Sequence, residues 1–287
     1  MNQLTLHTGT LINERSLLKQ RRLSIVIPVY NEAATVHLIL DMIKEVVLIN
    51  GMEKELVIVN DCSTDQTAAA IRTYIAANPS MNIRYFEHAA NTGKGGALHT
   101  GIQQATGEFI IVQDADLEYD PREYNSLLKP VLEGRADVVF GSRFMGGQPH
   151  RILFFWHSIG NRLLTFLSNM ATGLNLTDME TGYKLFKAEI LKSLPLREKR
   201  FGFEPEVTAR VARVKGVKIY EVGISYYGRT FHEGKKIGWK DGVRALYCIV
   251  KYKFKKDGQR AHIYTAEGRA TWVDKALYNE QSEPMDI

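Results

Sequence analysis

The chain has 287 residues, of which 45% are hydrophobic and 24% are charged. This composition is that of an ordinary globular protein without low-complexity tracts, and the length suits one large α/β domain or two small ones. The two cysteines, Cys62 and Cys248, lie far apart and have no metal-ligand spacing. They indicate neither a disulfide framework nor a zinc site, and they fit a reducing, cytoplasmic setting.

The net charge of +5 is unevenly distributed along the chain. Residues 229–260 contain ten Lys and Arg against three Asp and Glu, which gives a local charge of +7. The basicity is therefore a patch, and not a uniform background.

Neither a secretion signal nor a membrane span is expected. Residues 1–22 contain no apolar core of signal-peptide length. The most apolar region, residues 152–171, is interrupted by His157, Asn161 and Arg162. Any membrane contact is therefore expected to be peripheral.

Strand and helix patterns alternate along the first half of the chain. We expect strands at residues 23–29, 55–60, 82–86, 108–113 and 136–140, and helices at 32–48, 65–77 and 94–105, with another helix that begins at Pro121. This alternation predicts an α/β fold with a largely parallel sheet, covered on both faces, whose functional loops follow the carboxyl ends of the strands.

The pattern changes after Gly147. Amphipathic helices are expected at residues 151–172 and 203–215, and a strand at 217–222, before the basic region. From Ala261 onward the chain is polar without a sustained period, which suggests a tail or a loosely docked strap. The expected organisation is an extension at 1–22, a catalytic domain at 23–222, a basic loop and amphipathic helix at 223–260, and a tail at 261–287.

The most informative motif is a pair of carboxylates, Asp114 and Asp116, that directly follows an apolar strand. Hard cations such as Mg²⁺ prefer oxygen ligands and usually share carboxylates with substrate phosphates. The motif therefore predicts a metal and phosphate site. The alternative is a solvated turn after an edge strand.

Two earlier strand-end loops fit a nucleotide. In the first, Tyr30 is placed to pack on a base and Glu32 to bond a ribose; the alternative is a plain connection with Asn31 as a helix N-cap. The second loop combines two acids with the hydroxyls of Ser63 and Thr64. Either hydroxyl is also suited to cap the next helix, and both interpretations are compatible.

A glycine-rich segment, residues 91–96, contains Lys94 followed by Gly95. The ATPase phosphate loop requires Ser or Thr at that second position, so the segment does not match a kinase or ATPase loop. Glycines and a lysine at a helix start still suit an anionic ligand, although a plain turn is an equally good interpretation.

Taken together, these loops resemble the family-2 glycosyltransferases, and within them the polyprenyl-phosphate mannose or glucose transferases. The resemblance runs from Ser24 to about Phe254 and implies a Rossmann-like nucleotide-sugar-binding domain of the GT-A type. The residues that carry it are Pro28-Val29-Tyr30-Asn31-Glu32, Asp61 with Ser63, Asp114-Ala115-Asp116-Leu117, Gly141-Ser142-Arg143-Phe144, and Asp178 with Thr181-Gly182-Tyr183-Lys184.

The resemblance also implies roles for the matched positions. The donor would be bound by Pro28, Tyr30, Glu32, Asp61, Lys94 and Asp114. Asp116 would hold Mg²⁺ or Mn²⁺ together with Glu118. Mannose synthases often have Gln at the position of Glu118, so this departure leaves the third protein ligand open and weakens a mannose assignment.

In addition to Asp116, the resemblance implies four catalytic residues: Arg143, Asp178, Arg229 and Lys235. Arg143 would face the phosphates, where a guanidinium grips two oxygens; the alternative is a surface salt bridge. Asp178 lies where relatives that glycosylate hydroxyls carry a base, but a lipid phosphate is already an oxyanion at pH 7, so Asp178 is also suited to orient cations or cap a turn. Arg229 and Lys235 look like an acceptor and diphosphate loop, with a solvated hairpin as the alternative.

Two segments have the pattern of a membrane-surface helix. Residues 152–167 combine a bulky apolar face with Arg151 and Arg162 at its margins, and residues 239–256 mix apolar residues with lysines. Core packing is the alternative interpretation of both.

The predicted activity is an inverting transfer of a hexose from UDP-glucose or GDP-mannose to a polyprenyl phosphate at the cytoplasmic membrane face. A homodimer is compatible with this prediction, and no nucleic-acid partner is expected. The alternatives are transfer to a saccharide or protein hydroxyl, with Asp178 as the base, and a non-catalytic nucleotide-sugar-binding subunit.

Overall fold

The computed structural model describes residues 21–147, 151–152, 155–229, 238–255, 260–264 and 270–274. Its elements in chain order are β1 (Arg22–Val29), α1 (Val36–Glu45), the 3₁₀ turn η1 (Ile49–Gly51), β2 (Glu53–Asn60), α2 (Thr67–Ala77), β3 (Ile83–Glu87), α3 (Lys94–Gln104), β4 (Phe109–Val112), η2 (Pro121–Glu123), α4 (Tyr124–Leu132), β5 (Val138–Ser142), α5 (Phe155–Thr172), β6 (Lys184–Lys187), α6 (Ala188–Ser193), α7 (Phe203–Val211), β7 (Ile219–Gly223), α8 (Trp239–Phe254), β8 (Arg260–Tyr264) and β9 (Ala270–Asp274).

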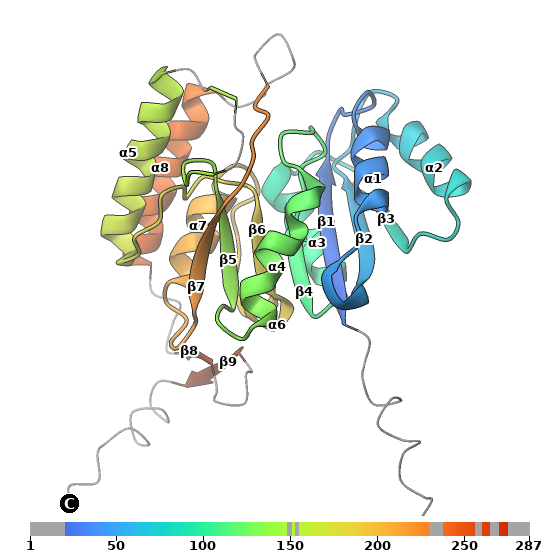
Figure 1. The fold of residues 1–287 in the computed structure, drawn as a ribbon. Helices are drawn as coiled ribbons and strands as arrows, with labels where there is room; N and C mark the ends of the chain where they lie inside the picture. The colour runs from blue at the N-terminus through green and yellow to red at the C-terminus, as the bar shows by residue number, and fades with distance from the viewer. Residues whose placement is uncertain are drawn as a thin grey trace, which may run out of the picture.

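Seven of these strands form one sheet in the order β3-β2-β1-β4-β6-β5-β7 (Figure 1). β1 runs parallel to β2 and β4, β2 to β3, and β5 to β7, whereas β6 is antiparallel to both β4 and β5. The expected α/β architecture with a mostly parallel sheet is confirmed. Because β1, β2 and β4 run in the same direction, the loops that follow them meet at one edge of the sheet.

Helices cover both faces of the sheet, and each face has its own core. Ile25 and Ile27 of β1 pack in the cluster that includes α1, α2 and α4, whereas Val26 packs in the cluster that includes α3, α6 and α7. Alternate side chains of a strand point to opposite faces, so a strand covered on both faces is apolar throughout. This arrangement explains the continuous apolar runs by which these strands are recognised in the sequence.

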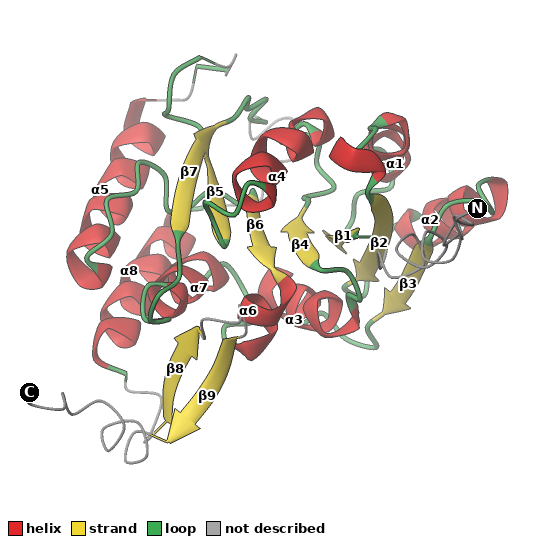
Figure 2. Ribbon diagram, turned by 60° about the horizontal axis from the view of Figure 1, so that its bottom comes forward, coloured by secondary structure: helices red, strands yellow, loops and turns green. Residues whose placement is uncertain are grey.

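Three features differ from the sequence-based expectation. The strand β6 was not expected, and it carries Lys184, whose side chain is fully buried against the carboxylate of Glu204. Helix α1 begins at Val36, not at residue 32, because residues 32–35 form a turn in which Thr35 and Val36 both donate to the Glu32 carbonyl. The segment after Ala261 includes strand β9 and most of β8, which pair in an antiparallel hairpin (Figure 2).

Asn31, Ser63 and Thr64, the residues considered as helix caps, do not cap a helix. Asn31 lies outside α1 with a φ of 51°, and its backbone N–H donates to Ser63 Oγ at 3.0 Å. Helix α2 begins after Asp65, whose Oδ1 accepts from the Thr67 backbone N–H at 3.0 Å. The polar residues of these two loops therefore bond mainly across the gap between the loops, which ties the ends of β1 and β2 together.

Candidate functional site

The two carboxylates after β4 have different partners. Lys94 at the start of α3 places its Nζ 2.7 Å from Asp114 Oδ1 and 2.8 Å from Oδ2. Asp116 accepts from the Glu118 backbone N–H at 3.1 Å and lies 3.3 Å from Arg229 Nη2. The turn that separates the two carboxylates from η2 includes Leu117 with a φ of 64°. The predicted pair thus lies in an ordered turn between two cations.

Asp116 is electrostatically unusual. Burial, followed by the negative charges of Asp114 and Glu118, raises the pKa of Asp116 to about 7, and Arg229 only partly compensates. Crowded carboxylates of this kind favour a bound cation, because a cation removes their mutual repulsion. Among the described residues no three His, Cys, Asp or Glu side chains converge as a ready-made metal centre. The donor set therefore fits Mg²⁺ or Mn²⁺ held by one or two carboxylates together with substrate phosphates.

Arg229 connects the segment after β7 to the end of β1. Its Nη2 lies 3.1 Å from Glu32 Oε1, and its backbone N–H donates to Glu118 Oε1 at 2.7 Å. The hydroxyl of Tyr226 donates to the other oxygen, Glu118 Oε2, at 2.7 Å. The structure thus brings together Glu32, Asp116, Glu118 and Arg229. Both carboxylate oxygens of Glu118 already accept a hydrogen bond within the protein.

The residues assigned to the base and ribose lie at the ends of β1 and β2. Pro28 is half-buried within β1, and Tyr30 is 37% exposed directly after it. Asp61 is buried and accepts hydrogen bonds from the backbone N–H groups of Thr92 and Gly93 at 2.9 and 2.6 Å. Burial alone would raise the pKa of Asp61, but these bonds and those from the Thr92 hydroxyl and His88 lower it. Asp61 therefore fixes the loop that precedes α3.

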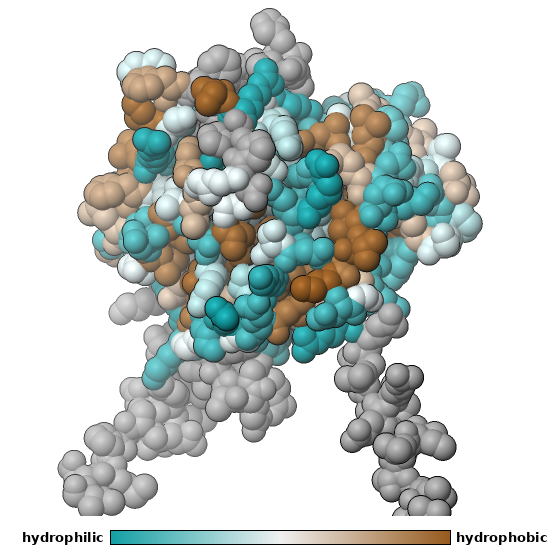
Figure 3. Space-filling view, viewed as in Figure 1, coloured by the Kyte–Doolittle hydropathy of each residue, from teal (hydrophilic) through white to brown (hydrophobic). Residues whose placement is uncertain are grey.

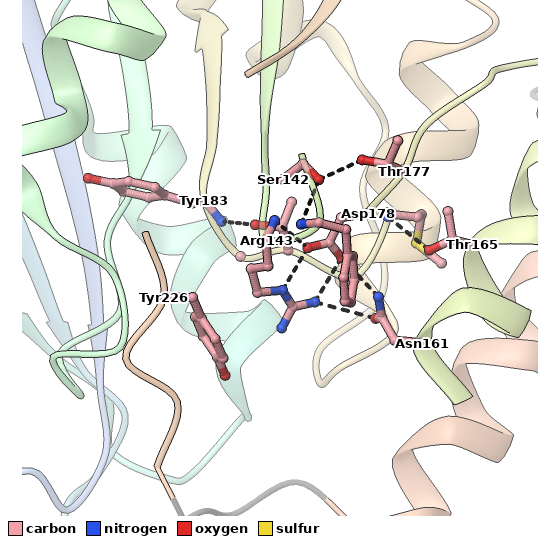
Figure 4. A network of polar contacts seen from close by, with 12 residues as sticks. Ser142, Arg143, Asn161, Thr165, Thr177, Asp178, Tyr183 and Tyr226 are labelled. Carbon is pink, nitrogen blue, oxygen red and sulfur yellow. Dashed lines mark hydrogen bonds and ion pairs between the residues drawn. The ribbon is translucent and has the colours of Figure 1, made fainter. Parts of the chain in front are cut away.

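A second polar centre joins the end of β5 to the loop before β6 (Figure 4). Arg143 donates through Nε to Asp178 Oδ2 at 2.6 Å and through Nη2 to Oδ1 at 2.8 Å. Asn161 of α5 donates to the same carboxylate at 3.1 Å, and the Arg143 guanidinium lies 5.0 Å from the ring centroid of Tyr226. Asp178 is fully buried, which alone would raise its pKa, but Arg143 lowers it. The carboxylate is therefore held ionised.

Two residues around these centres were not assigned a role from the sequence: Asn161 beside Asp178, and Gly182 beside Asp114. Asn161 is a polar residue in the middle of an amphipathic helix, where nothing in the pattern distinguishes it from the solvent-facing positions. Gly182 was recognised only as part of a motif; a Cβ atom there would lie 2.8 Å from Asp114 Oδ2 and 3.2 Å from Lys94 Nζ. Lys235, the remaining predicted residue, lies outside the described part of the chain.

A mostly parallel sheet with a carboxylate pair after β4 is the architecture of the GT-A glycosyltransferases. Glucosyl-3-phosphoglycerate synthase from Mycobacterium tuberculosis, solved with Mn²⁺, uridine diphosphate and phosphoglyceric acid, superposes with a TM-score of 0.63 over 88% of this chain and 86% of that one, at 18% identity. The same enzyme in complex with Mn²⁺ and UDP-glucose superposes with a TM-score of 0.61. The GT-A fold is therefore confirmed.

The chain belongs to glycosyltransferase family 2, because the sequence profile of "Glycosyl transferase family 2" matches residues 24–194. Dodecaprenyl-phosphate galacturonate synthase from Rhizobium johnstonii is 26% identical over 232 residues, which are 81% of this chain and 66% of that relative. Undecaprenyl-phosphate mannosyltransferase from Micrococcus luteus is 29% identical over 227 residues, 76% of this chain and 88% of the relative. The protein is thus a glycosyltransferase, and the predicted enzyme class is confirmed.

Proposed function

We propose that this glycosyltransferase moves a hexose from a nucleotide diphosphate sugar, UDP-glucose or GDP-mannose, to a polyprenyl phosphate at the cytoplasmic face of a membrane. The two curated relatives carry polyprenyl-phosphate sugar transfer in their names, which supports this acceptor class. The observation that carries the proposal is the ion pair between Arg143 and Asp178.

This pair distinguishes two acceptor chemistries. A hydroxyl acceptor needs a general base with a proton affinity matched to the task, but Asp178 is paired with Arg143 and Asn161 and its pKa is lowered. A phosphate acceptor is already an oxyanion and needs a positioned cation instead. In our proposal Arg143, oriented by Asp178, supplies part of that positive charge.

The donor would be bound where the loops after β1, β2 and β4 meet. Asp116, with Asp114 beside it, would hold Mg²⁺ or Mn²⁺, which neutralises charge on the departing diphosphate when it is bound. We keep Glu118 as a candidate third ligand, and Pro28, Tyr30, Glu32 and Asp61 as the base and ribose site. Lys94 and Arg229 would add positive charge near the phosphates, so most of the acceleration would come from positioning and electrostatics.

Attachment to the membrane surface is proposed through the adjacent helices α5 and α8. Exposed large apolar side chains on these helices are Phe155, Trp156, Ile159, Leu163, Phe166, Met170, Val243, Leu246, Tyr247, Val250 and Phe254. Figure 3 shows apolar side chains gathered on the side that carries α5. In the described ranges no helix has both the length and the apolarity to cross a membrane. A two-helix apolar face bordered by lysines and arginines suits an interfacial contact with anionic lipid.

The test is transfer of label into an organic-solvent phase. Purified protein would be incubated with Mg²⁺, undecaprenyl phosphate and either radiolabelled UDP-glucose or GDP-mannose. We expect EDTA-sensitive label in the lipid with one of the two donors. Nucleotide-sugar binding without any lipid label, in a preparation that transfers to a saccharide, would exclude the phosphate acceptor.

A further inference from the structure

A group of cations outside the donor site lines a cavity of about 660 Å³ between the loop before α3, the loop before α7, and α8. The lining residues are Asn91, Thr92, Arg197, Glu198, Lys199, Arg200, Asp241, Arg244 and Lys251. Five of these carry positive charge and two carry negative charge, so the wall has a net charge of +3. A cavity of this size and charge can hold a phosphate-bearing group.

The inner wall of the cavity is organised by Glu198. Its carboxylate is 4% exposed and accepts from Arg244 Nη2 and from Lys251 Nζ, both at 2.6 Å, and from the hydroxyl of Tyr252 at 2.9 Å. Burial alone would raise the pKa of Glu198, but the bonds from Lys251, Arg244 and Tyr252 lower it to about 2. One buried negative charge thus holds two cations in place, and one positive charge remains uncompensated.

The other three cations, Arg197, Lys199 and Arg200, are exposed on the outer wall. Their backbone is fixed, because Glu206 accepts from the Arg197 N–H at 2.8 Å and Gly96 donates to the Lys199 carbonyl at 2.9 Å. Within the described ranges no hydrogen bond or ion pair involves these three side chains. This loop thus presents three exposed cations to the cavity, where their positive charge would attract a bound anion.

The cavity borders the apolar face of α8. Tyr247 belongs to that face and is 54% exposed, and its ring centroid lies 5.2 Å from the Arg244 guanidinium and 5.7 Å from Lys251 Nζ, two of the cavity cations. A phosphate inside the cavity would therefore lie next to the surface on which acyl chains would rest. An arginine guanidinium binds two phosphate oxygens through two parallel hydrogen bonds. A phosphate group can accept both bonds, whereas a simple counterion cannot.

We propose that this cavity binds the phosphate headgroup of an anionic membrane lipid, separately from the acceptor site at Arg143. The inference rests on the proposed membrane attachment and adds a lipid-selective contact to it. The headgroup would fix the enzyme on the membrane with α8 against the bilayer and the loop before α3 close to its surface.

The experiment compares two charge-matched triple variants of the full chain. The first variant, Arg197→Gln/Lys199→Gln/Arg200→Gln, removes the outer cations of the cavity. The control variant, Lys129→Gln/Arg135→Gln/Lys218→Gln, removes three cations at the carboxyl-terminal end of α4, which does not line the cavity. Binding to vesicles of phosphatidylcholine, with and without phosphatidylglycerol, is measured by co-sedimentation at fixed ionic strength. We expect the first variant to lose at least about tenfold in affinity for vesicles that contain phosphatidylglycerol and to bind phosphatidylcholine vesicles unchanged, because basic side chains are attracted to anionic lipid. Equal losses in both variants, or none in the first, would overturn the proposal.

Two further measurements separate the possible causes. Inorganic phosphate at constant ionic strength should fail to displace phosphatidylglycerol vesicles; displacement would assign the cavity to a soluble phosphate and overturn the lipid assignment. Transfer to detergent-solubilised undecaprenyl phosphate should be unchanged in the first variant, which separates this cavity from the proposed activity. A loss of transfer with unaltered vesicle binding would place these cations in the donor site instead. Circular dichroism verifies that both variants are folded.

Discussion

Arg143 and Asp178 form a bidentate ion pair whose two hydrogen bonds measure 2.6 and 2.8 Å, with the carboxylate fully buried and the guanidinium side chain 13% exposed. Arg143 directly follows β5 and Asp178 lies in the loop before β6. Each of these two catalytic candidates therefore depends on the other for its position. Because opposite charges at this distance each stabilise the charged form of the other, Asp178 is a poor proton acceptor and Arg143 is a fixed cation.

The first prediction concerns Asp178→Asn. The amide leaves Arg143 without its counter-charge in a buried setting, so we expect the free energy of unfolding to fall by about 3 kcal/mol in urea titrations. If the acceptor is a phosphate, transfer should fall only about tenfold, mainly through a higher KM for the acceptor, because the cation is displaced but no base is lost. A loss of about a thousandfold in kcat in a folded variant would identify Asp178 as an essential base.

The second prediction concerns the competition between Arg229 and a metal ion. The guanidinium lies 3.3 Å from Asp116 Oδ2, an oxygen that we propose for the metal. We expect Arg229→Gln to bind Mn²⁺ about fivefold more tightly without donor, since about 1 kcal/mol of competing charge is removed, and to transfer sugar more slowly. Isothermal titration calorimetry measures the affinity, and Arg122→Gln, which removes an exposed partner of Asp120, is the matched control. Weaker or unchanged Mn²⁺ binding would contradict the shared site.

The third prediction tests the close approach of Gly182 to the donor loop. Alanine there would place a Cβ 2.8 Å from Asp114 Oδ2, so the Lys94 and Asp114 pair must shift. We expect nucleotide-sugar affinity to fall about tenfold in Gly182→Ala, because small displacements of a charged site are costly. Gly160→Ala, whose new methyl group meets nothing within 4 Å, should bind like the wild type. Equal affinities in the two variants would remove Asp114 from the proposed site.

The sheet was predictable to the extent that its strands are covered on both faces. β4 is apolar throughout, and β1 and β2 contain apolar runs at residues 25–29 and 56–59, so the strand-end positions of the acids followed directly from these runs. β6 was missed because its four residues begin and end with a charged residue, Lys184 and Lys187, and the burial of Lys184 is compensated by Glu204. Its antiparallel pairing with β4 and β5 depends on contacts distant in sequence, which local pattern does not contain.

The types of side chain in the site were predictable, but their pairing was not. Carboxylates after parallel strands meet at one edge by topology, which placed Glu32, Asp61 and Asp116 at the same edge of the sheet. The bonds between Arg229 and Glu32 and between Arg143 and Asp178 span 197 and 35 residues. Each of these arginines was expected to face phosphates, and the structure instead shows both paired with carboxylates. Sequence reasoning identified the charges but could not tell which of them neutralise each other.

The last prediction is the pH dependence of stability that Glu198 confers. Its pKa is lowered from the ordinary 4.5 to about 2, so its contribution is complete above pH 4.5 and is lost as the pH falls toward 2. Because Arg244 is half exposed, we discount the full shift and expect Glu198→Gln to lose about 2 kcal/mol at pH 7. The difference in urea midpoint between wild type and variant should therefore narrow between pH 5 and pH 3. Glu133→Gln, which removes an exposed partner of Arg135, should show a small difference that changes little with pH. A constant gap for Glu198→Gln would mean that its carboxylate charge does not organise the basic cavity.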